Sequence, residues 1–264
     1  MPNAAAVRHS IVLALALLVA PLVHAAETET EGAAAPLDWQ SWRAGNEVGN
    51  SASLQRGARN FFNYCAGCHS LKYLRYSRLA TDLHLTTAQL QANLLPAGAT
   101  PADYVKASLA AADGVAWFGK QPPDLSLVAR SRGPDWISRF LRTFYADPST
   151  PTRSNNLQLP NPAMPAVLSD LEGVKEAVFR NVEVVVDGKP STEKQFDHFV
   201  TVVPGQLDAA QYEAFVRDTV NFLDYAGEPA QVERRSIGVW VVLFLLVFTW
   251  FAWLLKKEYW KDVH

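Results

Sequence analysis

One short motif constrains this chain more than any other feature of its sequence. Cys65, Cys68 and His69 spell Cys-Ala-Gly-Cys-His, and a mostly apolar helical run from about Ser53 precedes them. Cysteines three apart near a helix end lie on one face, where each thiol can add to one vinyl group of a porphyrin. The adjacent histidine is then placed to coordinate the iron. The motif therefore predicts one covalent haem c held by these three residues.

Two other interpretations of the cysteine pair deserve comparison. Cys-x-x-Cys also occurs in thioredoxin-like redox proteins and in zinc sites. The chain has only two cysteines, so no second pair exists to complete a zinc site with four cysteines. Neither alternative requires a histidine directly after the second cysteine. Haem attachment is therefore the favoured interpretation.

The amino-terminal segment predicts export. Arg8 precedes an apolar run from Ile11 to Val23, and Val23-His24-Ala25 supplies small or tolerated residues before a cleavage site after Ala25. The run is too short to span a bilayer, so residues 1–25 are expected to be a secretory signal peptide. Residues 26–36 are rich in alanine, glutamate and threonine, which is typical of a mobile tail. The domain that follows is expected in the periplasm.

The carboxyl-terminal segment predicts a membrane anchor. Residues 237–255 form a stretch of 19 residues without a charge, which is about 28 Å long as a helix and matches a hydrocarbon core. Tryptophans lie towards both ends, and lysines follow in residues 256–264. We expect a single span in contact with lipid, in the cell inner membrane, with this basic tail in the cytoplasm.

Residues 37–232 are expected to form one mainly α domain, a cytochrome c-like haem domain with a small β-hairpin and long proline-rich loops. Five prolines between Asp147 and Pro165 predict an extended, stiffened loop there. Hydrophobic periodicity and breaker residues predict helices at 53–64, 86–95, 101–112, 134–145 and 208–225, and strands at 181–186 and 196–203.

Few side chains can provide the sixth iron ligand. Met164 is the only methionine besides Met1, and it lies among the prolines of the stiffened loop. A methionine in such a loop is not expected to serve only for core packing. His/Met ligation also raises the reduction potential of an electron-transfer haem. His84, His198 and an open coordination position remain as alternatives. His264 lies beyond the predicted anchor, on the other side of the membrane.

The order of these features resembles cytochrome c1 of the bacterial cytochrome bc1 complex over nearly the whole mature chain. The residues that carry the resemblance are Cys65-Ala-Gly-Cys-His69, Pro122-Pro123-Asp124-Leu125-Ser126, Arg130, Arg132 and Met164-Pro165, flanked by the signal peptide and the anchor.

The resemblance implies roles for individual residues. His69 and Met164 match the axial ligands, and Arg132 matches the arginine that meets a haem propionate. A carbonyl of the Pro122-Pro123 turn, taken here as that of Pro123, would accept a hydrogen bond from the histidine Nδ1–H. Trp136 lies near the place where the family often has a tyrosine beside the haem. Some relatives brace a loop with an extra cysteine pair, which this chain lacks, so we expect packing alone to hold its proline-rich loop.

The resemblance also implies a function and partners. The haem would relay single electrons from the Rieske iron–sulfur protein to a soluble cytochrome c, alongside cytochrome b, in a respiratory chain. Quinol chemistry would belong to other subunits, so no bond-making catalysis is expected of this one, and nothing points to nucleic acid. The alternatives are a free-standing tethered cytochrome c that feeds an oxidase, and a haem enzyme with an open iron site.

Overall fold

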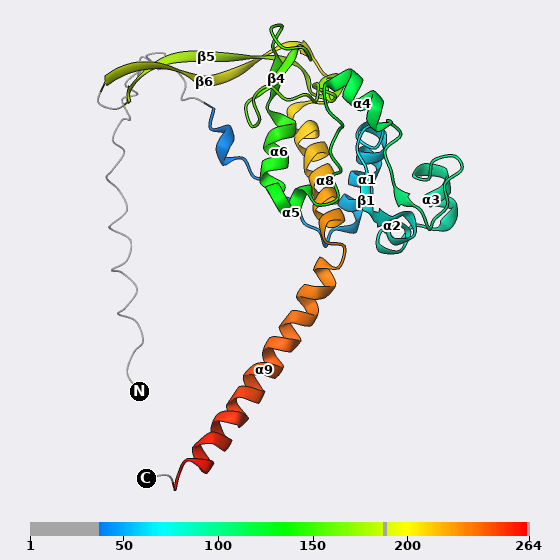
Figure 1. Cartoon of the computed structure of the whole chain (residues 1–264), viewed down its shortest axis with the longest axis vertical. Helices are drawn as coiled ribbons and strands as arrows, with labels where there is room; N and C mark the ends of the chain where they lie inside the picture. The colour runs from blue at the N-terminus through cyan, green and yellow to red at the C-terminus, as the bar shows by residue number, and fades with distance from the viewer. Residues whose placement is uncertain (1–36, 187–188, 263–264) are drawn as a thin grey trace, which may run out of the picture. The chain divides into compact units, whose positions relative to one another are not determined.

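The computed structural model describes residues 37–186 and 189–262, and the predicted signal peptide and tail lie outside these residues. A short 3₁₀ turn, Trp39–Ser41, is followed by the helices α1 Ser51–Tyr64, α2 Tyr76–Asp82, α3 Thr87–Asn93, α4 Ala111–Phe118, α5 Val128–Arg132, α6 Pro134–Arg142, α7 Ser169–Glu172, α8 Ala209–Gly227 and α9 Gln231–Tyr259. The strands are β1 Leu71–Arg75, β2 Tyr104–Val105, β3 Phe144–Ala146, β4 Ser154–Asn156, β5 Gly173–Val186 and β6 Lys189–Pro204. They pair in order as three antiparallel two-stranded sheets. The predicted mainly helical fold is confirmed (Figure 1).

The centre of the domain is the packing of α1 against α8, with α6 beside α8 (Figure 1). Phe61 of α1 and Phe222 of α8 are fully buried, and their ring centroids lie 5.6 Å apart. The two helices approach closely because Gly57 is buried in α1 and presents no side chain to α8. This helix pair is the rigid support from which the cysteine motif extends.

Helix α1 starts earlier than predicted. Its N-cap is Asn50, whose side chain accepts a hydrogen bond from the backbone N–H of Ser53 at 3.0 Å. Ser53 was expected to cap the helix, but it lies inside the first turn, and its buried hydroxyl donates to Asp218 at 2.6 Å. A long-range buried partner therefore determines the role of Ser53. The predicted start of α8 is confirmed, since Asp208 and Gln211 form a capping box there.

The helix predicted at 101–112 is wrong. Val105 in this segment pairs with Leu71 of β1, and the N–H of Ala107 donates to the hydroxyl of Ser70 at 2.8 Å. Regular structure resumes only at Ala111, where α4 begins. The segment has a helical pattern locally, but tertiary hydrogen bonds to the chain just after the cysteine motif take precedence over its propensity.

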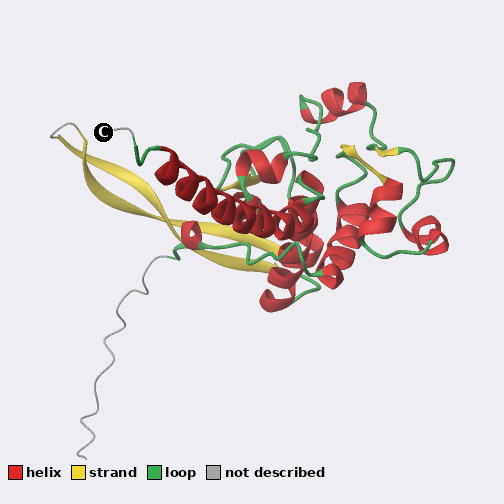
Figure 2. Cartoon of the chain, turned by 90° about the horizontal axis from the view of Figure 1, so that it is seen from below, coloured by secondary structure: helices red, strands yellow, loops and turns green. Residues whose placement is uncertain are grey.

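The hairpin is longer than the predicted strands at 181–186 and 196–203. Strand β5 spans 14 residues and β6 spans 16, with register shifts after Val174 and Val178. Figure 2 shows the two strands twisting about each other along their length. Charged residues such as Lys175 and Arg180 interrupt the apolar alternation, so the sequence pattern recovers only part of each strand.

Helix α9 contains the predicted span. It has 29 residues, which gives a length of about 43 Å. Among the described residues it is the one helix that is long and apolar enough to cross a membrane, and its apolar window is not buried against the rest of the described chain. The predicted range 237–255 lies within it, so the structure fits a single-pass membrane protein.

Candidate haem-binding site

The cysteine motif forms a tight turn directly after α1. Cys65 is the C-cap residue, and its carbonyl accepts hydrogen bonds from the N–H groups of Cys68 at 3.1 Å and His69 at 2.9 Å. These bonds hold both thiols and the imidazole on one short piece of backbone. Neither cysteine forms a disulfide; Cys65 is half-buried and Cys68 is exposed. Both thiols are therefore available for attachment.

The thiol of Cys65 differs from a reactive thiolate. Burial raises its pKa to about 12, and the neighbouring Cys68 adds to the shift. Catalytic and metal-binding cysteines are instead found where the surroundings lower the pKa. In the absence of a bound group, the Cys65 thiol is therefore protonated at neutral pH.

The imidazole of His69 is oriented by the chain opposite it. Its Nδ1 lies 2.7 Å from the carbonyl oxygen of Pro123. Because a carbonyl can only accept, Nδ1 carries the hydrogen and Nε2 keeps a lone pair. Burial lowers the pKa of His69, so the ring is neutral, as a metal ligand must be. Nε2 has no hydrogen-bond partner among the residues that the structure describes, which leaves it open to a metal.

The turn that contains Pro123 is itself fixed to the motif. The side chain of Asp124 accepts from the N–H groups of Lys72 at 2.8 Å and Ser126 at 3.0 Å. The N–H of Leu125 donates to the carbonyl of Ser70 at 2.9 Å. These bonds hold the Pro123 carbonyl against the segment that follows His69, and so keep the orientation of the ring.

Arg132 is the last residue of α5, and Trp136 lies in the first turn of α6. The Arg132 guanidinium is 5.1 Å from the centroid of the Trp136 ring, which in turn stacks on Phe140 at 5.2 Å with an interplanar angle of 8°. Arg132 is exposed and has no carboxylate partner within the described ranges. An exposed guanidinium without a partner, next to a half-buried aromatic pair, is suited to meet an anionic group such as a propionate.

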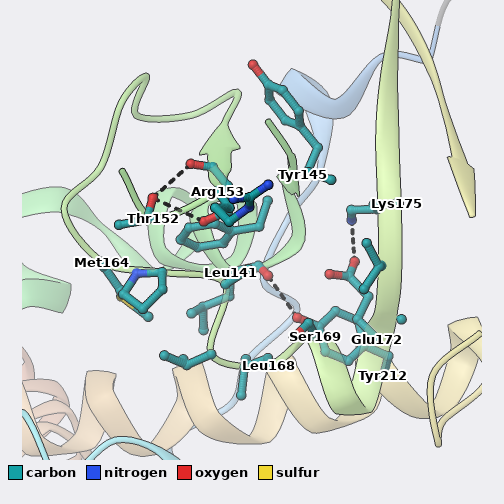
Figure 3. Close-up of a pocket in the computed structure, with 18 residues that line it drawn as sticks. Leu141, Tyr145, Thr152, Arg153, Met164, Leu168, Ser169, Glu172, Lys175 and Tyr212 are labelled. Carbon is teal, nitrogen blue, oxygen red and sulfur yellow. Dashed lines mark hydrogen bonds and ion pairs between the residues drawn. The ribbon is translucent and has the colours of Figure 1, made fainter. Parts of the chain in front are cut away.

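Met164 lies in the proline-rich loop and is half-buried. It lines a cavity of about 220 Å³ with Leu141, Leu168 and Lys175 (Figure 3), and this lining does not include the cysteine motif. Cys65, Trp136 and Met164 nevertheless all pack against the same buried core. The alternative ligands lie elsewhere, because His84 is exposed after α2 and His198 is exposed on β6, where its Nδ1 is 2.8 Å from Asp197.

These residues fit a covalent haem. Two available thiols, together with an imidazole Nε2 and a guanidinium that have no polar partner in the described part of the chain, are the groups that a covalent haem needs. Several apolar side chains in or near the segments that contain these groups pack on the core yet remain partly exposed, namely Phe62, Leu125, Val128, Trp136, Phe140 and Met164. A flat apolar ring system would cover such surfaces.

The sequence interpretation missed the residues that hold the loop around Met164. Asn155 and Asn156 are buried polar side chains that make several hydrogen bonds each. The loop is therefore not held by packing alone, and that expectation is wrong. The only local signal was a pair of asparagines ahead of a proline run, which indicates a turn but not its partners.

The chain resembles known proteins over most of its length. The model of the Cytochrome C1 family matches residues 46–263. A cytochrome c1 from Allochromatium vinosum is 47% identical over 83% of this chain and 87% of its own length. A protein from Nitrosomonas europaea named ammonia monooxygenase gamma subunit is 38% identical over 96% and 97%, and a cytochrome c1 from Rhodospirillum rubrum is 29% identical over 86% and 87%. The chain therefore belongs to the Cytochrome C1 family.

Proposed function

We propose that this chain is the haem c subunit of a cytochrome bc1 complex, in which it relays single electrons from a Rieske iron–sulfur protein to a soluble cytochrome c. Members of the Cytochrome C1 family bind one covalent haem c and transfer electrons. The observation that carries the proposal for this chain is the hydrogen bond from His69 Nδ1 to the Pro123 carbonyl, which leaves Nε2 for the iron.

Each proposed site residue has a separate task. Cys65 and Cys68 attach the group, His69 and Met164 are the proposed axial ligands, and Arg132 is the proposed partner of a propionate. The exposure of His84 and His198 supports Met164 over either histidine. When bound, the haem supplies a one-electron couple, and a thioether ligand raises its reduction potential.

The proposed role of this subunit is electron transfer without bond-making catalysis. The orientation of the iron ligands therefore matters for how readily the haem exchanges an electron. The Pro123 carbonyl holds His69 in one tautomer and one ring orientation, a contact that tunes the metal through its ligand. The core under Trp136 and Phe140 keeps water from one side of the site. Rigid ligands favour electron transfer because little has to move when the charge on the iron changes.

We place the haem domain, residues 37–232, in the periplasm and the tail, residues 256–264, in the cytoplasm. Lys256, Lys257 and Lys261 follow the apolar part of α9, and basic residues next to a span favour the cytoplasmic side. Cytochrome b is the proposed neighbour of α9 in the membrane, since one relative is a cytochrome b/c1 protein. Family membership argues against a free-standing tethered carrier and against an enzyme with an open iron site.

A second candidate partner comes from the relative named ammonia monooxygenase gamma subunit. Purification from native membranes through a tag on the tail separates the two proposals. We expect a cytochrome b and an iron–sulfur protein to copurify, and quinol to reduce the c-type haem of the preparation. A quinol analogue that blocks the complex should abolish that reduction. Recovery with monooxygenase subunits, or as a single polypeptide that quinol still reduces, would contradict the bc1 assignment.

A further inference from the structure

The carboxyl end of α6 is held in an unusual way. The last four carbonyls of an α-helix have no partner within the helix. In α6 each of these four accepts a hydrogen bond from a different side chain. The donors and acceptors are Thr143 Oγ1 to Arg139 at 2.8 Å, Asn156 Nδ2 to Phe140 at 2.8 Å, Tyr212 Oη to Leu141 at 2.8 Å and Lys175 Nζ to Arg142 at 2.6 Å.

Two of these donors flank Met164 in the sequence. Asn156 precedes it by eight residues and Lys175 follows it by eleven. Asn156 is 1% exposed, so its hydrogen bond to Phe140 is shielded from water. The Lys175 side chain is 10% exposed and forms an ion pair with Glu172 of α7. The segment that contains Met164 is therefore tied to the end of α6 on both sides.

The chain just after Asn156 is fixed by the same side chain. Asn156 Oδ1 accepts from the N–H groups of Gln158 at 2.9 Å and Leu159 at 3.0 Å. Asn155 Oδ1 accepts from the N–H of Asn161 at 2.7 Å. The N–H of Leu157 donates to the carbonyl of Thr143 at 3.2 Å.

Since residues 160 and 162 are prolines and have no N–H, every backbone donor from 157 to 162 has a partner. Residues 157–162, the part of the loop next to Asn156, are therefore held through all of their backbone donors. The prolines at 160 and 162 restrict the backbone between Asn156 and Met164, so the position of Asn156 limits where Met164 can lie.

We propose that Asn156 is a positioning residue for Met164, and that Asn156 and Lys175 together set the distance of the thioether from the haem iron by fastening its loop to the end of α6. This inference rests on the proposed ligation by Met164. Helix α6 also contains Trp136 and Phe140 of the candidate haem site. A loop that is fastened to α6 is therefore held in position relative to that site.

The test compares three variants of the full haem-loaded chain. Met164→Leu should abolish the absorption band at the red end of the visible spectrum, which arises from the bond between the haem iron and the methionine sulfur. Asn156→Ala should weaken that band, lower the reduction potential and let the reduced protein bind carbon monoxide. The fraction of molecules with the thioether detached should rise about fivefold for each hydrogen bond lost from the loop.

Tyr212→Phe is the matched control. It removes a hydrogen bond of the same length from the same helix end, but Tyr212 belongs to α8 and not to the Met164 segment. We expect it to lower the unfolding midpoint while the band and the potential stay as in the parent chain. If Asn156→Ala is recovered without haem, Asn156→Ser replaces it, because serine is too short to reach Phe140 yet keeps an acceptor near Gln158.

The outcomes separate the two proposals. If Met164→Leu keeps the band, the axial assignment fails whatever Asn156 does. If Met164→Leu loses the band while Asn156→Ala, or Asn156→Ser in its place, keeps the parent band and potential, the positioning role is wrong and the axial assignment stands. If Tyr212→Phe weakens the band as much as Asn156→Ala, the effect belongs to the helix end in general, and the specific role of Asn156 is overturned.

Discussion

Gly57→Ala is expected to cost at least about 3 kcal/mol of the free energy of unfolding, because overpacking against rigid backbone is not relieved by small shifts. A Cβ at this position would meet the Cβ of Phe222 at 2.7 Å and lie still closer to the carbonyl oxygen of Asp218. Both belong to α8, so α1 and α8 would have to separate. Chemical denaturation of the purified chain measures the loss.

Gly49→Ala serves as the control for this prediction. Gly49 is exposed, and a Cβ there would have no heavy atom within 4 Å. We expect its unfolding free energy to change by less than about 0.5 kcal/mol, as for most surface substitutions. A Gly57→Ala chain as stable as Gly49→Ala would show that α1 and α8 are not locked at this crossing.

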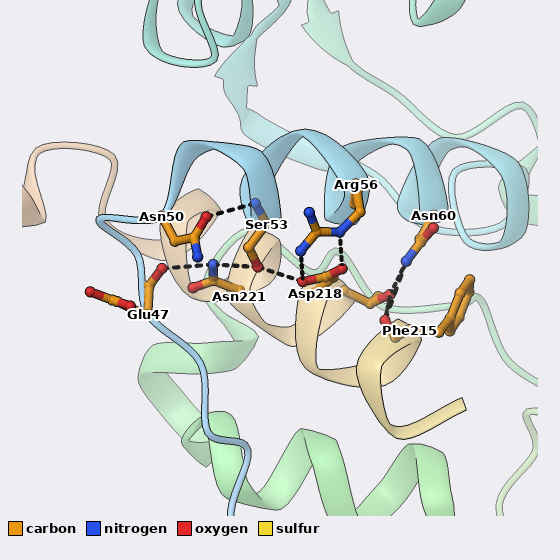
Figure 4. Close-up of polar contacts among 9 residues, drawn as sticks. Glu47, Asn50, Ser53, Arg56, Asn60, Phe215, Asp218 and Asn221 are labelled. Atoms are coloured by element: carbon orange, nitrogen blue, oxygen red, sulfur yellow. Dashed lines mark hydrogen bonds and ion pairs between the residues drawn. The ribbon is translucent and has the colours of Figure 1, made fainter. Parts of the chain in front are cut away.

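The second large effect is expected at the polar network between the same helices (Figure 4). The buried carboxylate of Asp218 accepts from Arg56 Nε at 2.5 Å, from a second guanidinium nitrogen at 3.0 Å and from the Ser53 hydroxyl at 2.6 Å. Arg56→Leu would leave this carboxylate buried without its cation. Because the Arg56 side chain is half-exposed, we expect a loss of about 2–3 kcal/mol, at or below the low end for buried pairs.

Three further variants isolate the interaction in denaturation experiments, namely Arg59→Leu, Asp218→Leu alone, and the double variant of Arg56 and Asp218. Arg59→Leu removes a neighbouring exposed arginine of α1 that makes no ion pair in the described part of the chain, and it should change stability little. The double variant Arg56→Leu with Asp218→Leu should recover most of the loss, because replacing both ions by apolar groups removes the unpaired buried charge. A double variant as unstable as the sum of the singles would mean that Arg56 and Asp218 act independently.

Local signals in the sequence predicted the parts of the structure that depend on local physics. The cysteine motif, the helix start at Asp208, the proline at the start of α6 and the apolar run of α9 each depend on residues that are close together in the sequence. The contact between His69 and the Pro123 carbonyl was expected only through the family resemblance, since 54 positions separate the two residues.

Long-range hydrogen bonds explain what the sequence did not reveal. The segment 101–112 follows a helical pattern, but part of it pairs with β1 and donates a hydrogen bond to Ser70 instead of forming a helix. The four caps of α6 come from donors as far as 71 positions away, and no spacing rule connects Tyr212 to Leu141. Asn156 also looks like an ordinary turn residue until its partners are known.

The most direct test of the whole account is whether the mature chain holds a haem through two thioether bonds. The full chain, produced in a host that matures c-type cytochromes, is extracted with acidified organic solvent and then examined by the pyridine haemochrome spectrum. We expect the haem to stay with the polypeptide, the spectrum to be that of haem c, and Cys65→Ala with Cys68→Ala to abolish both. A colourless chain, or a haem that the solvent removes, would contradict the account.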